Sequence, residues 1–115
     1  MSSEVETSLT LVFGMARDYD FWVYIMTNRN HSVLYIGLTN ALARRTSEHR
    51  QGIGANFPAA YQCKKLIYQE YYSDVNEAIA RESQLKKWSR MKKITLINRL
   101  NPSWIDLGAD VLADD

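Results

Sequence analysis

The sequence contains little of what would tie it to a secreted, membrane-bound or multidomain protein. Its one cysteine, Cys63, excludes an internal disulfide and cannot by itself build a structural zinc site. Two prolines and five glycines leave little room for long flexible linkers. No apolar run approaches the ~20 residues that a membrane-spanning helix needs. A single domain in a reducing compartment, hence the cytoplasm, is therefore expected.

What the 115 residues do contain is the composition of one globular domain. Hydrophobic residues make up 46%, aromatic residues 11% and charged residues 23% of the chain. These proportions exclude wholesale disorder, because disordered chains have fewer apolar and aromatic residues. The length is enough to bury one modest hydrophobic core.

The formal net charge of +1 hides a segregation of charge along the chain. Residues 1–20 contain four acids and one base, and residues 106–115 contain four acids and no base. The remaining residues, 21–105, therefore carry a net charge of +8. A cationic body with acidic ends is typical of a nucleic-acid-binding surface, and equally of a solvated lysine-rich surface with acidic tails.

Residues 21–107 show the sustained pattern of a small α+β domain. Three runs with strand-like patterning, the first of them rich in aromatic and β-branched residues, are expected to be strands: 21–27, 33–37 and 63–72. Three stretches with helical periodicity or capping signals are expected to be helices: 41–50, 75–89 and 90–100. The predicted order is β-β-α-β-α-α, a three-stranded antiparallel sheet flanked by helices.

The first two predicted strands form a β-hairpin in this interpretation. A tight loop centred on Arg29 and Asn30 places Tyr24 opposite Tyr35, with both rings on one face of the sheet. Thr39 or Asn40 is expected to cap the helix that follows.

The two ends of the chain lie outside the patterned domain. Residues 1–20 are expected to be a poorly ordered extension, within which Met15 is an alternative start. The acidic Glu4 and Glu6 near the beginning do not fit a signal peptide. Residues 108–115 are expected to be a frayed acidic tail.

Glu82 is the residue that fits its expected surroundings least. The helix predicted over 75–89 gathers its apolar residues on one side, and Glu82 falls in the middle of that side. A carboxylate there is costly unless it is paired, hydrogen-bonded or bound to a metal. Two interpretations stay open: a site residue, or a partly exposed glutamate that pairs with Lys86 one turn later.

The helix predicted over 41–50 carries a second set of polar residues beside an apolar one. Arg45 and His49 follow Leu42 at helical spacing, so all three share one stripe. A histidine one turn after an arginine, close to two tyrosines of the hairpin, is less easily explained as an ordinary surface residue.

Basic residues gather at the junction of the last two predicted helices, where five fall within eight residues. Two further arginines add charge on the first helix. The residues expected to contact phosphates without reading sequence are Arg44, Arg50, Lys86, Lys87, Arg90, Lys92 and Lys93. The alternative for this set is a plain solvated surface.

Taken in chain order, these residues resemble the GIY-YIG nuclease superfamily. The resemblance is carried by Trp22-Val23-Tyr24, Tyr35-Ile36-Gly37, Arg45, His49 and Glu82. The chain looks especially like the small stand-alone bacterial members, which are related to the nuclease domain of the excinuclease C subunit. It departs from the family pattern where Trp22 replaces a glycine, and where Leu38 stands at the position of a lysine proposed to assist the chemistry in some relatives.

The resemblance implies a metal-dependent endonuclease that hydrolyses phosphodiester bonds in DNA, with structure-selective cutting and a role in repair or recombination among its options. The implied catalytic residues are Tyr24, Tyr35, Arg45, His49 and Glu82, with Asn101 as a candidate supporting residue. Glu82 would bind Mg²⁺ or Mn²⁺, and Tyr24 would activate or orient the attacking water. The general base stays open, as does an RNA substrate. The alternative is a nucleic-acid-binding module of the same fold with little independent catalysis.

Overall fold

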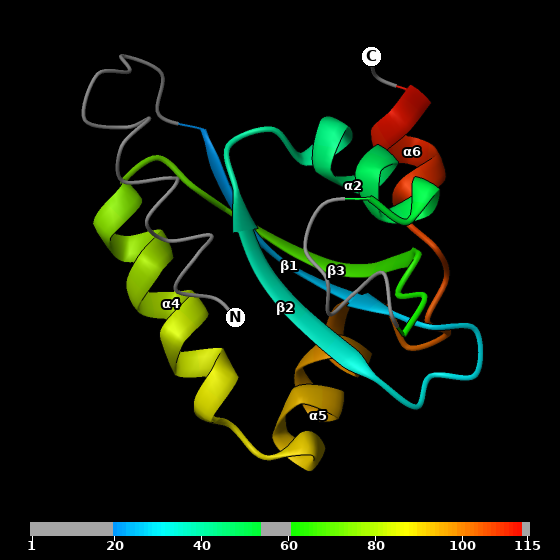
Figure 1. Ribbon diagram of the computed structural model, residues 1–115. Helices are drawn as coiled ribbons and strands as arrows, with labels where there is room; N and C mark the ends of the chain where they lie inside the picture. The colour runs from blue at the N-terminus through cyan, green and yellow to red at the C-terminus, as the bar shows by residue number, and fades with distance from the viewer. Residues whose placement is uncertain (1–19, 54–60, 114–115) are drawn as a thin grey trace.

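A central sheet lies between two layers of helices in the computed structural model (Figure 1). The structure describes residues 20–53 and 61–113. In chain order the elements are β1 (Phe21–Thr27), β2 (Leu34–Thr39), α2 (Leu42–Gln51), β3 (Lys65–Tyr72), α4 (Val75–Lys87), α5 (Arg90–Leu100) and α6 (Gly108–Ala113). Nearly all of the predicted extension, and the last two residues of the predicted tail, lie outside the described part of the chain. No helix within the described ranges is long and apolar enough to cross a membrane.

The sheet is antiparallel with strand order β2-β1-β3, which confirms the predicted architecture and element order. The central strand β1 is buried along almost its whole length. A strand covered on both faces needs apolar residues at successive positions, and the run from Val23 to Met26 meets this need.

The hairpin pairs in a different register from the predicted one. Tyr24 lies opposite Gly37, and Tyr35 lies opposite Met26, so the prediction that the two tyrosines face each other directly was wrong. The loop runs from residue 28 to 33, and its centre lies one residue later than predicted. A one-residue shift of the centre moves each partner by two positions, which keeps side chains on the same face. The predicted shared face of the two rings is therefore confirmed.

Two hydrophobic clusters fill the two sides of the sheet. One joins Val23, Ile25 and Leu38 to the helices α4 and α5. The other contains Tyr24, Tyr35 and Leu42, and is covered by α2 and α6 (Figure 1). The alternation of β1 side chains sends Tyr24 to the side of α2 and its neighbours Val23 and Ile25 to the side of α4.

The starts of α4 and α2 are capped in different ways. The carboxylate of Asp74 accepts a hydrogen bond of 3.1 Å from the Asn76 amide, an N-cap that begins α4. The cap predicted for α2 was wrong, because its N-cap residue is Ala41 and no side chain caps it. The Thr39 hydroxyl accepts a bond from the Ala41 amide instead.

Helix α6 lies where a frayed tail was predicted, so that expectation was wrong for residues 108–113. Two contacts tie its start to β3: the Leu107 amide donates to the carbonyl of Leu66, and the Leu66 amide donates to Asp106. Leu107 and Val111 then pack onto the cluster beneath α2. Six residues are too few to show a helical period, so packing rather than pattern defines this helix.

Candidate active site

Two tyrosines and a histidine from three different elements meet on the α2 side of the sheet. The Tyr24 hydroxyl oxygen lies 3.1 Å from Nε2 of His49, and all three rings are buried. The ring centroids of Tyr24 and Tyr35 are 6.4 Å apart, and that of His49 lies 5.7 Å from the first and 5.5 Å from the second. The structure thus brings together three of the predicted site residues in one hydrogen-bonded cluster.

Gly37 explains how the ring of Tyr24 reaches this position. A Cβ atom added at Gly37 would lie 2.4 Å from both Cζ and the hydroxyl oxygen of Tyr24. The phenol ring therefore crosses from the central strand over the backbone of the edge strand β2. Any side chain at residue 37 would displace the ring, which is the steric reason for a glycine here.

Arg45 supplies positive charge beside the cluster, as its place on the stripe with Leu42 and His49 predicts. Its side chain is 20% exposed, and its Nε atom lies 3.5 Å from the carboxylate of Glu48, so the pairing is loose. The arginine charge lowers the pKa of Tyr24 and of His49. Arg45 is thus half-buried and charged at the edge of the site.

The site keeps Tyr24 and His49 neutral at physiological pH. Burial raises the pKa of Tyr24, Tyr35 raises it further, and the charge of Arg45 only partly opposes this. Burial, with the charge of Arg45, lowers the pKa of His49 to about 4. A neutral imidazole has one nitrogen able to accept a proton, so the Tyr24 hydroxyl can donate to Nε2.

Three buried polar atoms of α2 at this site have no hydrogen-bond partner among the described residues: Nε of Arg45, the hydroxyl of Thr46 and Nδ1 of His49. Buried polar atoms are nearly always satisfied, so such exceptions call for a physical reason. All three belong to the inward stripe of α2. A bound water or a substrate atom at this stripe would satisfy them.

Glu82 is fully buried on α4, between the apolar contacts of Ala78 and Leu85. Its carboxylate accepts a hydrogen bond of 2.8 Å from Nζ of Lys86, one turn later. The predicted pairing with Lys86 is therefore present, and a site role for the inward-facing carboxylate stays a prediction. The prediction of a partly exposed glutamate was wrong.

Glu82 approaches the tyrosine cluster from the other side of the sheet. Helix α4 packs on β1 and on the edge strand β2, over which the Tyr24 ring passes. The charge of Glu82 raises the pKa of Tyr24, so the carboxylate lies within electrostatic range of the hydroxyl. The five predicted residues thus come from four elements, with Glu82 on the α4 side of the sheet and the other four on the α2 side.

The donor set suits a hard divalent cation that keeps most of its water. Within residues 20–53 and 61–113, no three His, Cys, Asp or Glu side chains are placed to share a metal ion. Zinc, which takes three or four protein ligands, does not fit this arrangement. Mg²⁺ and Mn²⁺ bind through one or two carboxylates plus water and phosphate oxygens, and Glu82 offers one such carboxylate. The Lys86 ammonium already forms an ion pair with that carboxylate, as a metal cation would.

Several of the bases predicted to contact phosphates make contacts within the protein. Arg50 forms an ion pair of 2.7 Å with Asp106, and Arg90 donates to backbone carbonyls of the hairpin loop. Lys92 lies 4.6 Å from the centre of the Trp88 ring. Burial and the charge of Arg90 lower the pKa of Lys93, which is partly buried. Arg44 and Lys87 are exposed to solvent.

Asn101 is buried, and its contacts are with backbone groups. Its amide donates to the carbonyls of Ile67 and Ile105, and its oxygen accepts from the Ile105 amide. These bonds hold the turn after α5 against β3. Its described contacts are thus those of a structural tie, and a part in the chemistry stays a prediction.

One charged neighbour of the site was missed by sequence reasoning. Glu48 pairs with Arg45 and raises the pKa of Tyr24, which works against ionisation of the tyrosine. Its spacing of three residues from Arg45 was the available signal, because such pairs meet on a helix surface.

Comparison with known proteins identifies the family of this chain. The family model described as the GIY-YIG catalytic domain matches residues 20–95. UPF0213 protein CPE1444 of Clostridium perfringens is 38% identical over 77 residues, which cover 67% of this chain and 82% of that one. UPF0213 protein SH2523 of Staphylococcus haemolyticus is 36% identical over 83 residues, covering 72% of this chain and 96% of that one.

A solved structure is also similar. The solution NMR structure of UPF0213 protein BH0048 from Bacillus halodurans has a TM-score of 0.48 and 25% identity, and covers 76% of this chain and 92% of that chain. The chain belongs to the GIY-YIG family of catalytic domains, alongside the small UPF0213 proteins. Membership of a nuclease family implies nuclease activity and nucleic-acid binding, and GIY-YIG nucleases generally use divalent metals.

Proposed function

We propose that this chain is a divalent-metal-dependent endonuclease that hydrolyses phosphodiester bonds in DNA. The observation that carries the proposal is the buried hydrogen bond between Tyr24 and His49, with Arg45 on the same helix as His49 and the buried carboxylate of Glu82 within electrostatic range. A module that only binds nucleic acid needs phosphate contacts and has no use for a buried carboxylate next to a tyrosine–histidine pair.

In this proposal Tyr24 and His49 act as a proton relay. The Tyr24 hydroxyl donates to neutral Nε2 of His49, and it takes the proton of the attacking water as its own proton passes to the imidazole. Because burial raises the pKa of Tyr24, the hydroxyl is a poor base alone. The lowered pKa of His49 also opposes proton transfer to the imidazole, so the relay depends on added positive charge near the phenol oxygen.

Arg45 binds the scissile phosphate in the same scheme. Its loose contact with Glu48 leaves the guanidinium available, and two parallel hydrogen bonds to phosphate oxygens would hold the group in line with the water. Arg45 would also oppose the negative charges that raise the pKa of Tyr24.

Glu82 is the residue that would hold Mg²⁺ or Mn²⁺. When bound there, the cation supplies charge neutralisation at the phosphate and at the leaving oxygen. Lys86 must then release the carboxylate, and its side chain is 28% exposed, so a path to solvent is open to it. We place this activity in the cytoplasm, in DNA repair or recombination, on the strength of the resemblance to excinuclease nuclease domains.

A specific observation favours a second candidate function. Lys86 already compensates the carboxylate of Glu82, and the pKa of Tyr24 is raised, so the resting site is poorly prepared for catalysis. These two features favour a nucleic-acid-binding module of this fold with little independent catalysis.

One experiment separates the two candidates. Purified protein is incubated with linear, nicked, flapped and single-stranded DNA and with RNA, in Mg²⁺, Mn²⁺ or EDTA. Glu82→Gln is compared with wild type and with Glu77→Gln, which changes an exposed glutamate of the same helix. The proposal expects cutting by wild type and Glu77→Gln only with a divalent cation. Cutting that persists in EDTA or in Glu82→Gln would contradict it, and binding without cutting on every substrate would favour the module.

A further inference from the structure

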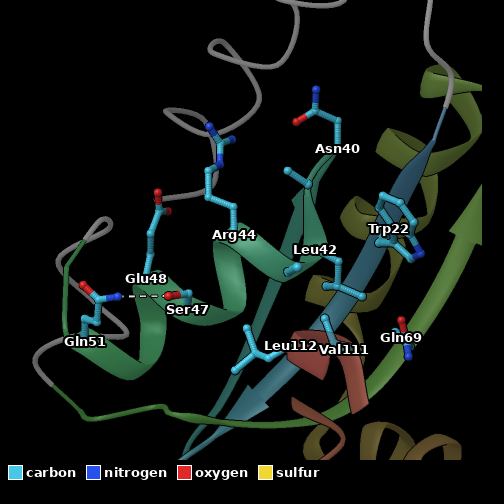
Figure 2. A pocket seen from close by; sticks show the side chains of 12 residues that line it. Trp22, Asn40, Leu42, Arg44, Ser47, Glu48, Gln51, Gln69, Val111 and Leu112 are labelled. Carbon is cyan, nitrogen blue, oxygen red and sulfur yellow. Dashed lines mark hydrogen bonds between the residues drawn. The ribbon is translucent and has the colours of Figure 1, made fainter. Parts of the chain in front are cut away.

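A hollow beside the tyrosine cluster takes no part in the reaction described above (Figure 2). It has a volume of about 890 Å³ and is lined by α2, α6 and residues of β1 and β3. Pockets of ~300–1,000 Å³ are typical of sites that bind small molecules or parts of larger ones. The size alone therefore admits a flat ring system with room around it.

Trp22 stands at one side of this hollow, as Figure 2 shows. It is only partly buried, and its ring meets the edge of the Tyr71 ring at a centroid distance of 5.7 Å. That contact restrains the indole plane. Trp22 precedes Tyr24 by two residues on β1, so both side chains lie on the same face of the sheet, ~7 Å apart along the strand.

The other lining groups suit a neutral, hydrogen-bonding ring better than a phosphate. Leu42 and Val111 provide apolar surface, and the amides of Asn40 and Gln69 each offer donors and an acceptor. Amide side chains of this kind match the edges of nucleobases. The charged lining residues are Arg44 and Glu48, one of each sign.

We infer that this hollow binds a nucleobase of an unpaired strand, stacked on Trp22, within one or two nucleotides of the scissile phosphate. The inference rests on the proposed function, because it takes nucleic acid as the ligand. A base inside a duplex is stacked and cannot enter such a hollow, so an unpaired or extruded nucleotide is the substrate feature recognised. Stacking on an aromatic side chain accepts any base, so the site selects strandedness more than sequence.

The test is a binding experiment in EDTA, which does not depend on cleavage. Fluorescence anisotropy measures the affinity of labelled single-stranded DNA, the same sequence as RNA, and the corresponding duplex. A series of single strands with one abasic position each then locates the recognised base. Trp22→Leu removes the ring and keeps an apolar side chain, and Trp22→Phe keeps an aromatic ring. Tyr61→Leu is the matched control, since it removes an exposed aromatic ring that lines a different hollow.

The expected result is coupling at one position. There, an abasic site weakens binding by wild type and by Trp22→Phe at least about fivefold, and leaves Trp22→Leu unchanged. Abasic effects equal in wild type and Trp22→Leu at every position would overturn the inference, as would duplex binding with the same dependence on Trp22. Coupling between Trp22 and one base, without cleavage in Mg²⁺, would support base binding in the hollow and contradict the proposed nuclease activity. Cleavage without such coupling would support the nuclease activity and contradict base binding in the hollow.

Discussion

Replacing Lys86 by methionine tests whether the buried carboxylate of Glu82 is a metal-binding group that the Lys86 ammonium neutralises when no metal ion is bound. Methionine keeps the length and the apolar stem of the side chain and removes the ammonium. Glu82 has no exposed surface, whereas the Lys86 side chain is 28% exposed. The change therefore removes the ammonium that pairs with a buried negative charge while disturbing the packing little.

The expected loss of stability lies between two limits. Breaking a fully buried ion pair by removing one partner costs about 3–5 kcal/mol. An exposed pair at this helical spacing contributes only about 0.2–0.5 kcal/mol. Since one partner is buried and the other partly solvated, we expect a loss of about 1–3 kcal/mol in EDTA. In a domain of this size 1 kcal/mol lowers the melting temperature by about 4–8 °C.

The assay is thermal unfolding in EDTA and across a titration of Mg²⁺ or Mn²⁺. A ligand that binds only the folded state stabilises it by about 2.7 kcal/mol at a hundred times its dissociation constant. Removal of the competing ammonium is expected to strengthen cation binding, so Lys86→Met should gain more stability from the cation than wild type does. Lys87→Met is the matched control, because it removes an adjacent exposed ammonium.

Two results would refute this reasoning. If Lys86→Met is as stable as Lys87→Met in EDTA, the ion pair does not compensate a buried charge. If the cation stabilises Lys86→Met no more than wild type, Lys86 does not stand in a cation position. Adding Glu82→Gln to Lys86→Met should restore most of the lost stability, because the buried negative charge is then gone.

Three further predictions concern the tyrosine cluster. Gly37→Ala forces a methyl group onto the Tyr24 ring and should cost about 1–3 kcal/mol in urea unfolding, with cleavage lost. Tyr24→Phe keeps the ring and should abolish cleavage while leaving anisotropy-measured binding in EDTA unchanged; undiminished cutting would exclude the relay. The pKa of His49 falls to about 4 on folding, so the unfolded chain takes up its proton first as the pH drops. Stability should therefore be full above pH ~6.5 and fall by up to about 3 kcal/mol toward pH 4, and His49→Gln should flatten that slope.

The hairpin shows which features of a strand pair can be predicted from residue spacing alone. Alternation along β1 was enough to place Tyr24 and Tyr35 on one face, because any even shift of register preserves the face. The direct partner of Tyr24 depended on the centre of the loop. There His31 adopts a φ of 61° and the side chain of Asn28 accepts bonds from Ser32 and Val33. Such a loop is defined by its own hydrogen bonds, which a count of polar residues does not reveal.

The charge pattern shows a different limit. The sequence distinguishes a cationic body from acidic ends. It does not reveal which basic residues form ion pairs or hydrogen bonds within the folded protein. Arg50 is one of these, because its partner Asp106 lies 56 residues later, beyond the last predicted helix. The same ion pair helps to anchor the start of α6. A contact of this range needs the tertiary structure, since no local pattern links the two residues.

Glu82 shows why the most informative residue of the sequence was also the hardest to interpret. Periodicity could show that its side chain faces inward, but pairing with Lys86 and binding of a cation appeared as alternatives. In the proposed function they are successive states of one carboxylate. A fully buried charge must be compensated whenever the protein is folded, including when no metal is bound. A lysine one turn away on the same helix does this, and its long chain, partly in solvent, lets it withdraw. The fold can therefore carry a buried metal ligand without depending on the metal for its stability.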